Sequence, residues 1–406
     1  MPADILAEFG LEPGRVHLNH GSFGAVPRVV QTEQQRLRVR AEANPMRFHR
    51  VELPALVEQA RAAGAEFLSV AADEIALVRN PTEAVATVLS ALAGRRLLGP
   101  GATVLTSQQG YGAVAMAVQH WCQRTGASHG IIRLPAGAGD DDVVEAYRTT
   151  IRDTQHQGQV PRLVVVDQIT SPTGALLPAA AVAEVAGEFG ALTLVDAAHG
   201  PGQVPVEPGI ADFWTGTFHK WAYAPRGSAA LWVAEQHRDW VAPLTTSWNH
   251  GQPFPRPFDL HGTDDYSAWA SLPVALGFWA EVGGPQLGPR ATGLLDEALP
   301  IVSAVSGGTD APVPGHPAPC LRLVPLPAGL ADAPERADAL YETLSERGAE
   351  VQPVAFDGRG YLRLSANVYN DLDDYRRLAA VLEGVLADGG SATRRDDGRR
   401  RTSVGR

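Results

Sequence analysis

Short apolar runs alternate with helix-like segments through the middle of the chain. The runs predicted as strands are residues 102–107 ("ATVLTS"), 162–168, 191–198, 211–217 and 228–234, and helical spacing is found at 112–126 and 178–190. This alternation is typical of βαβ units, in which helices cover a buried sheet of mostly parallel strands. Ligands of such α/β folds bind beyond the carboxyl ends of the strands, so we expect the chemically active residues there.

Asp167, Asp196 and Lys220 stand at or just beyond the ends of three of these strands. Lys220 is the only lysine among 34 lysine and arginine residues. Arginine replaces lysine as a surface cation but not as a nucleophilic amine, because its guanidinium stays protonated. A desolvated lysine amine attacks a carbonyl and forms a Schiff base. Codon bias toward arginine is the other explanation of a single surviving lysine, and the neighbouring residues decide between the two.

Those neighbours favour a pyridoxal phosphate site. The cofactor needs a lysine for the Schiff base and an aspartate that keeps its ring nitrogen protonated by charge pairing. Its phosphate needs backbone N–H donors at the start of a helix, and "RNPTEAVATVL" (79–89) begins one with a proline. Thr217 and His219 flank the turn that carries the lysine and offer a hydroxyl and an imidazole.

The chain is expected to divide into four parts. Residues 1–20 form an N-terminal arm, 21–269 the large cofactor-binding domain and 270–388 a smaller α+β domain. Residues 389–406 are rich in Gly, Ser and Arg and have no apolar period, which predicts a disordered basic tail.

Composition narrows the function classes. A net charge of −11 argues against a nucleic acid partner, and no apolar run reaches the length of a membrane span. The N-terminus lacks the basic and apolar regions of a secretory signal. Two cysteines without a CxxC pair predict neither a disulfide framework nor a metal site, so we expect a protein of the reducing cytoplasm. No GxGxxG follows the first strand, which argues against a dehydrogenase.

The motifs along the whole chain resemble those of one family. They are "LNHGSFGAVP" (18–27), "NPMRF" (44–48), "NPTEAV" (80–85), "GYGAV" (110–114), "ITSPTG" (169–174), "VDAAHGPG" (195–202), "GTFHKWAYAPRGSAALWV" (216–233), "HGTDDYSAW" (261–269) and "LRLSANVYN" (362–370). In these the sequence is similar to the class V aminotransferase group of fold-type I pyridoxal phosphate enzymes, and within it to the isopenicillin N epimerase-like branch. The resemblance covers all but the tail. It implies a mostly parallel seven-stranded sheet in the large domain, a smaller α+β C-terminal domain, an amino-acid-type substrate, and a homodimer with shared active sites.

The resemblance also implies roles for individual residues. Lys220 would bind the cofactor and later move the Cα proton, Asp196 would pair with the ring nitrogen, and His199 would lie near the 3-oxygen of the ring. The other cofactor-binding positions are Thr82, Glu83, Gln109, Gln168, Thr217, His219 and, from the neighbouring subunit, Thr263. Arg363 would clamp the substrate carboxylate, with Asn19 and His20 lining the substrate side. The structural alternatives are a surface cation for Arg363 and a loop cap for His20.

The chain departs from the family pattern beside the ring. Gln108 and Gln109 stand where the family usually has Asp-His, Gln168 replaces a second histidine, and Asp264 replaces an arginine. Tyr111 is the local aromatic residue that could cover the ring instead. Epimerisation needs an acid or base on each face of Cα, and only Lys220 is evident. We therefore expect a C–S lyase or a decarboxylating or oxidative deaminase acting on an L-amino acid or cysteine S-conjugate in specialised metabolism such as antibiotic biosynthesis. An epimerase or aminotransferase is the alternative.

Two further functions compete with these. A cysteine desulfurase belongs to the same group but needs a mobile thiol, and Cys320 begins the strand-like run "CLRLVPLP", so we expect a buried structural cysteine there. A non-catalytic, cofactor-binding regulator is a different class, which the glutamine replacements allow. The chain has no room for a DNA-binding domain before residue 18, which argues against it.

Overall fold

The computed structural model describes residues 5–309 and 312–400, with side chains described as far as residue 388. These residues form two compact units. The larger unit contains residues 5–10, 21–288 and 312–319, and the smaller contains residues 11–20, 289–309 and the chain from residue 320 onward.

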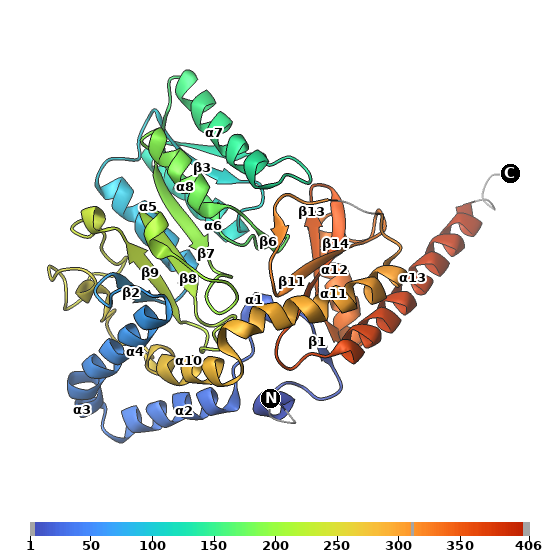
Figure 1. Ribbon diagram of the computed structural model, residues 1–406, viewed down its shortest axis with the longest axis horizontal. Coiled ribbons are helices and arrows are strands. Elements are labelled where there is room, and N and C mark those ends of the chain that lie inside the picture. The colour runs from blue at the N-terminus through green and yellow to red at the C-terminus, as the bar shows by residue number, and fades with distance from the viewer. Residues whose placement is uncertain (1–4, 310–311, 401–406) are drawn as a thin grey trace. The chain divides into compact units, whose positions relative to one another are not determined.

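The larger unit is built on a seven-stranded sheet (Figure 1). Its strands, in spatial order, are β2 (Ile75–Val78), β9 (Ala229–Val233), β8 (Phe213–Thr217), β7 (Leu192–Ala197), β5 (Val160–Asp167), β3 (Ala102–Ser107) and β4 (Ser128–Ile132). Strand β9 is antiparallel to both neighbours, and the others run in one direction. The mostly parallel seven-stranded sheet that the resemblance implies is therefore confirmed.

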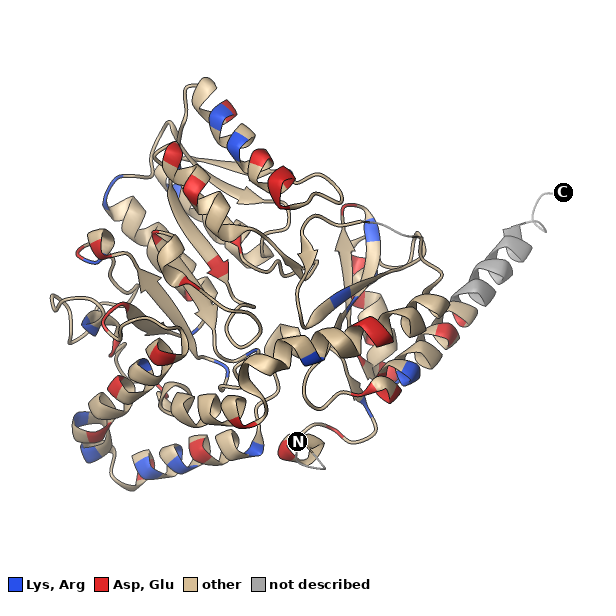
Figure 2. Cartoon of the chain, viewed as in Figure 1, with Lys and Arg blue, Asp and Glu red and all other residues tan. Residues whose placement is uncertain are grey.

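Helices cover both faces of this sheet because its strands are apolar on both sides. In β5, Leu163 and Val165 belong to one apolar cluster, and Val164 and Val166 belong to another. The first cluster includes α5 (Pro81–Gly94) and α6 (Gly112–Thr125); the second includes α4 (Leu53–Phe67), α7 (Asp140–His156), α8 (Ala179–Glu188), α9 (Ser267–Ala270) and α10 (Leu272–Glu281). Figure 2 shows charged residues along the helices, whereas the strands carry few.

Further elements lie outside the seven-stranded sheet and the helices named above. They are α1 (His20–Phe23), α2 (Arg28–Ala43), α3 (Pro45–Arg47), and the antiparallel pair of β6 (Ala175–Leu176) with β10 (His316–Pro317).

The smaller unit contains a three-stranded antiparallel sheet in the order β11 (Leu321–Pro325), β14 (Arg359–Ser365) and β13 (Gln352–Phe356). In addition, β1 (Val16–His17) pairs in parallel with β12 (Ala349–Glu350). Most of α11 (Leu287–Ser306), together with α12 (Pro334–Glu346) and α13 (Leu372–Arg400), belongs to this unit. Its composition is the α+β type that the sequence predicts.

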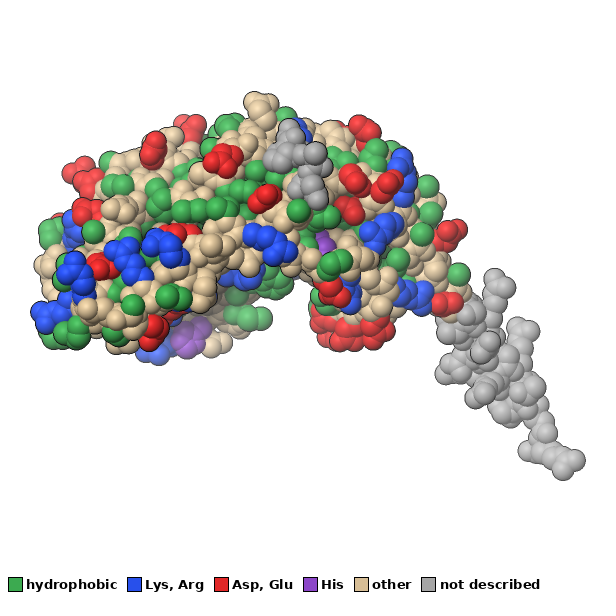
Figure 3. Space-filling model, turned by 90° about the horizontal axis from the view of Figure 1, so that it is seen from below, with side chains coloured by type: hydrophobic (Ala, Val, Ile, Leu, Met, Phe, Trp, Pro, Cys, Tyr) green, Lys and Arg blue, Asp and Glu red, His purple; other side chains and the backbone are tan. Residues whose placement is uncertain are grey.

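Two expectations concern the C-terminal tail and the ability of a helix to cross a membrane. The predicted tail, residues 389–406, lies outside the residues whose side chains the structure describes. Within the described ranges, no helix combines the length and apolar character that crossing a bilayer requires. Figure 3 shows basic and acidic side chains interspersed with hydrophobic ones over the face that it presents.

Candidate active site

The topology brings most of the predicted site residues to one edge of the sheet in the larger unit. Because β2, β3, β5, β7 and β8 are parallel, their carboxyl ends lie on the same edge. The residues that follow these strands are Thr82 and Glu83 after β2, Gln109 and Tyr111 after β3, Gln168 after β5, His199 after β7, and His219 and Lys220 after β8, while Asp196 and Thr217 lie at the ends of β7 and β8.

Two buried carboxylates lie side by side at this edge. Asp167 and Asp196 are partners in the register of β5 and β7, and both side chains are almost fully buried. Burial raises the pKa of both, and the neighbouring Asp196 raises the pKa of Asp167 further. Asp196 is the better stabilised anion, because it accepts a 3.0 Å hydrogen bond from the Ala198 N–H and because the charge of Lys220 lowers its pKa. Asp196 therefore keeps its negative charge more readily, and Asp167 takes up a proton first.

Lys220 lies against His199, and Trp221 orients that histidine. The Lys220 Nζ is 3.0 Å from His199 Nε2, and the Trp221 indole N–H donates to His199 Nδ1 at 3.4 Å. An indole nitrogen can only donate, so Nδ1 accepts and the neutral imidazole carries its proton on Nε2. The Nε2 side of the ring faces the Lys220 amine. Sequence reasoning missed Trp221, although it follows the lysine directly.

Close backbone contacts support the lysine turn. A Cβ atom on Gly202 would lie 2.5 Å from the Trp221 carbonyl carbon, and a Cβ atom on Gly24 would lie 1.9 Å from the His219 carbonyl oxygen. Both glycines have positive φ angles, +87° and +69°, which disfavour a side chain as well. The Thr217 hydroxyl donates to the Ala198 carbonyl at 2.7 Å, so this hydroxyl ties two strand ends together.

The start of α5 is a capped helix terminus. The Asn80 side chain accepts from the Glu83 N–H at 2.9 Å, and the Glu83 carboxylate accepts from the Arg79 N–H at 2.7 Å. Glu83 also forms an ion pair with Arg79, so its carboxylate is used within the chain. Thr82 is exposed, and among the described residues nothing accepts a hydrogen bond from its hydroxyl. Thr82 is therefore the member of this motif that can donate to a phosphate.

The residues that replace the family's histidines are placed differently from one another. Gln109 is fully buried, its Oε1 accepts from the Thr173 hydroxyl, and its Nε2 has no hydrogen-bond partner within the described part of the chain. The Gln168 Nε2 donates to the Pro205 carbonyl at 3.3 Å. Tyr111 is 46% exposed, and its backbone N–H donates to the Asp167 carboxylate. Its ring is thus accessible for covering a ligand.

The "HGTDD" turn holds a second residue that sequence reasoning missed. Thr263 is exposed, and its assignment to a neighbouring subunit's site stays a prediction. His261 is half-buried, its ring packs on Trp269 at a centroid distance of 5.2 Å, and burial lowers its pKa. The nearby charges of Glu83 and Arg79 also act on the pKa of His261, which places this turn near the start of α5.

In the smaller unit, the predicted substrate residues form a group of their own. Arg363 is buried on β14, and its Nη2 donates to Asn19 Oδ1 at 3.3 Å. Burial lowers the pKa of this guanidinium to about 10, because its charged form is desolvated. The His20 N–H donates to Ser365 Oγ at 2.8 Å, and its Nδ1 lies 3.0 Å from the Tyr369 hydroxyl. The surface-cation alternative for Arg363 is wrong, because the side chain is buried.

The remaining thiol candidate is not suited to nucleophilic attack. Cys320 lies next to β11 and is 3% exposed, and burial raises the pKa of its thiol. A protonated, buried thiol is neither mobile nor nucleophilic.

The donor set at the sheet edge fits pyridoxal phosphate. Asp196 offers a buried carboxylate for a pyridinium nitrogen, Lys220 an amine for the aldehyde, and Thr82 a donor at a helix start for the phosphate. The buried Gln109 Nε2, which lacks a partner among the described side and main chains, is a further donor toward a polar group. These groups match the charge and hydrogen-bonding needs of the ring, the aldehyde and the phosphate.

Comparisons with known proteins agree with this geometry. The aminotransferase class-V family matches residues 18–283. The isopenicillin N epimerase of Streptomyces clavuligerus is 30% identical over 93% of this chain and 96% of its own, and a probable chloroplastic L-cysteine desulfhydrase of Arabidopsis thaliana is 28% identical over 96% and 87%. The solved structure of the cysteine desulfurase of Thermococcus onnurineus is similar with a TM-score of 0.75 at 17% identity, covering 96% of this chain and 98% of that one, which supports the fold alone. The chain belongs to the aminotransferase class V family and is a pyridoxal phosphate enzyme of its isopenicillin N epimerase-like branch.

Proposed function

We propose that this enzyme is a C–S lyase that cleaves the Cβ–S bond of L-cysteine or an S-substituted L-cysteine. The observation that carries the proposal is the contact of Lys220 Nζ with His199 Nε2 at 3.0 Å, which provides one oriented base at the edge. Gln109 and Gln168 carry amides where the family usually has histidines, and an amide does not act as an acid or base near neutral pH. The desulfhydrase relatives are similar over almost the whole chain, which adds support.

The base works through its protonation state. As a neutral amine, Lys220 accepts the proton from Cα, and the His199 Nε2–H holds the lone pair in a defined direction until then. The Trp221 indole keeps His199 in the tautomer that this requires. The cofactor, when bound, supplies an electron sink for the pair released at Cα.

Two residues are proposed to meet charged groups of the cofactor and of the substrate. Asp196 stays ionised through the Ala198 N–H and Lys220, and it would pair with the protonated ring nitrogen. Arg363 is the proposed clamp for the substrate carboxylate, because a buried guanidinium with a lowered pKa gains most from an adjacent anion.

The proposed reaction is balanced by one water molecule. Loss of the Cα proton is followed by departure of the thiolate from Cβ. The thiolate then takes up a proton. Hydrolysis of the remaining three-carbon fragment gives pyruvate and ammonia, so that an S-substituted cysteine and water yield a thiol, pyruvate and ammonium.

Epimerisation at Cα is the second candidate, because the isopenicillin N epimerase relative is 30% identical over 93% of the chain. It requires a proton donor on the face opposite Lys220. The two reactions therefore differ in the number of bases and in the fate of the Cβ–S bond.

One incubation separates these candidates. The enzyme is supplied with pyridoxal phosphate and incubated in D₂O with L-cysteine and several S-substituted L-cysteines, and the products are analysed by mass spectrometry and chiral chromatography. A lyase releases thiol and pyruvate. Intact amino acid of inverted configuration with deuterium at Cα would contradict the proposal and identify an epimerase, and carbon dioxide release would identify a decarboxylating enzyme. The Lys220→Arg variant is the matched control, because it keeps the positive charge without a nucleophilic amine.

We also propose a homodimer in which Thr263 completes the partner's phosphate site, acting in the reducing cytoplasm on S-conjugates of specialised metabolism. The exposed position of Thr263 supports the first part, and two buried free cysteines agree with a reducing compartment. Light scattering coupled to size exclusion gives the oligomeric state. A monomer that is fully active would contradict the shared site.

A further inference from the structure

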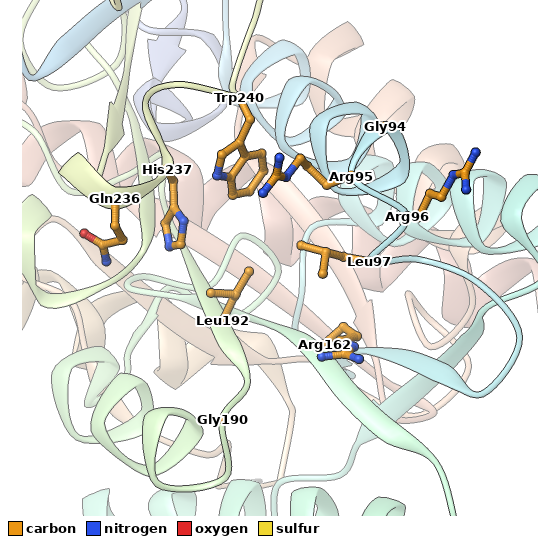
Figure 4. A pocket seen from close by; sticks show the side chains of 10 residues that line it. All are labelled: Gly94, Arg95, Arg96, Leu97, Arg162, Gly190, Leu192, Gln236, His237 and Trp240. Carbon is orange, nitrogen blue, oxygen red and sulfur yellow. The ribbon is translucent and has the colours of Figure 1, made fainter.

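A cavity of about 640 Å³ lies in the larger unit at the edge of the sheet opposite the candidate active site (Figure 4). It is lined by Arg162 near the start of β5 and by Leu192 at the start of β7, whereas Asp167 and Asp196 lie at the other ends of these strands. With about 3.3 Å per residue, Leu192 and Asp196 are roughly 13 Å apart along β7. This amino-edge cavity is therefore separate from the site of Lys220.

The walls of the amino-edge cavity carry three arginines, Arg95, Arg96 and Arg162. In the part of the chain that the structure describes, neither Arg95 nor Arg162 forms an ion pair or donates a side-chain hydrogen bond. Figure 4 shows the two on either side of Leu97. Arg95 directly follows α5 and so complements the negative end of that helix, but Arg162 lies on a strand, where no such role exists. The chain as a whole has a net charge of −11, so the charge of these arginines is opposite in sign to the net charge of the protein.

The floor of the amino-edge cavity is apolar and aromatic. Trp240 lies under the Arg95 guanidinium, 5.9 Å from the ring centroid, and its ring centroid is 5.1 Å from that of His237. Leu97 and Leu192 continue this surface. His237 Nε2 lies 2.7 Å from Asp212 Oδ1, a hydrogen-bond distance that fixes the ring.

We propose that the amino-edge cavity binds a small anion that carries an aromatic ring, of the nucleoside phosphate class. A single guanidinium can donate two parallel N–H···O bonds to a phosphate, and Arg95 and Arg162 both line the cavity, so we assign the phosphate to them. The ring packs on Trp240 and Leu192. The volume lies within the range of about 300–1,000 Å³ that is usual for small-molecule sites.

The test is isothermal titration calorimetry of the pyridoxal phosphate-loaded enzyme with AMP, ADP and inorganic phosphate. Because the cofactor occupies its own phosphate site, added nucleotide reports on other sites. AMP is expected to bind, and Arg95→Ala and Arg162→Gln are each expected to weaken binding tenfold or more, as the loss of a hydrogen bond to a charged group does. Trp240→Phe is expected to weaken AMP while leaving phosphate unchanged.

The matched control is Arg124→Ala. Arg124 also stacks on a tryptophan, 5.5 Å from the Trp121 ring, but it is an exposed residue of α6 outside the amino-edge cavity, so its loss is expected to leave AMP binding unchanged. Unaltered cofactor content and lyase activity show that each variant is folded. No binding of millimolar AMP or ADP would overturn the proposal. The proposal would also be overturned if phosphate and AMP bound with equal affinity or if both arginine variants left binding unchanged. Binding of polyglutamate in place of nucleotides would overturn it as well.

Discussion

Lys220 Nζ lies 3.0 Å from His199 Nε2, and the imidazole is fixed from its other side by the Trp221 indole. This chain of donors makes His199 a positioning partner of the base rather than a second base. We predict that His199→Phe lowers kcat by about 10- to 100-fold, because it removes a hydrogen bond to the reacting amine. Steady-state thiol release measures this.

Trp221→Phe provides the matched comparison for His199. It keeps an aromatic ring but removes the N–H that holds Nδ1 as an acceptor. At high pH we expect kcat to fall less than it does in His199→Phe. The loss of kcat is expected to grow as the pH falls, because an imidazole without its donor can take a second proton. A pH–rate profile that coincides with that of the wild type would contradict the role assigned to Trp221.

Replacing the two neighbouring aspartates with asparagine is predicted to have different effects. Asp196→Asn lowers activity, whereas Asp167→Asn raises stability. Asp196→Asn removes the charge that the ring nitrogen needs, and the loss of one partner from a buried ion pair costs about 3–5 kcal/mol. We expect activity to fall by about 100-fold or more while Lys220 still binds the cofactor. Cofactor absorbance and thiol release, measured on the same sample, separate these effects. Unchanged activity would exclude Asp196 as the nitrogen's partner.

Asp167→Asn is predicted to stabilise the cofactor-free protein. The pKa of Asp167 is raised in the folded state by burial and by Asp196. A raised folded-state pKa means that stability present below the ordinary carboxyl pKa of about 3.9 is lost as the pH rises toward the folded value. The neutral amide avoids that loss, so the variant's advantage in Tm grows with pH. An advantage that shrinks with rising pH would show that Asp167 is stabilised as an anion.

The glycine beside the lysine turn offers a test of packing. Gly202→Ala combines a positive φ of +87° with a Cβ that would lie 2.5 Å from the Trp221 backbone. Gly101→Ala is the control, since Gly101 has a φ of +84° with nothing within 4 Å. Both variants are expected to lose about 1–2 kcal/mol of unfolding free energy, because a residue with a Cβ is strained in the left-handed conformation. We expect Gly202→Ala to lose more and to bind the cofactor less well. Equal urea midpoints for the two variants would show that the backbone contact is relaxed easily.

The sequence predicted the elements that carry a clear pattern. The strand expected at 102–107 has those bounds in β3, and the helix expected at 112–126 agrees with α6 to within one residue. Strand β2 was missed because four consecutive apolar residues show no period. Helix α7 was missed because it buries only a narrow stripe, Val143, Tyr147, Ile151 and Thr154, on an otherwise polar surface.

The site was predictable where residues follow strand ends and not where they meet through space. Lys220 and Asp196 could be assigned because both stand at the ends of apolar runs. The bond from Trp221 to His199 joins residues 22 positions apart on different loops, and no local pattern reports it. Arg95 and Arg162 are likewise brought together only by the sheet, which places the end of α5 beside the start of β5.

The most direct test of the account is covalent trapping at Lys220. The enzyme loaded with pyridoxal phosphate is reduced with borohydride, which converts an imine bond to lysine into a stable amine, and the proteolytic fragments are analysed by mass spectrometry. We predict that the fragment containing residues 215–225 gains the mass of the reduced cofactor, and that Lys220→Arg abolishes both this mass and thiol release. An unmodified fragment from an active enzyme, or undiminished thiol release by Lys220→Arg, would contradict the assignment of Lys220 as the reacting amine.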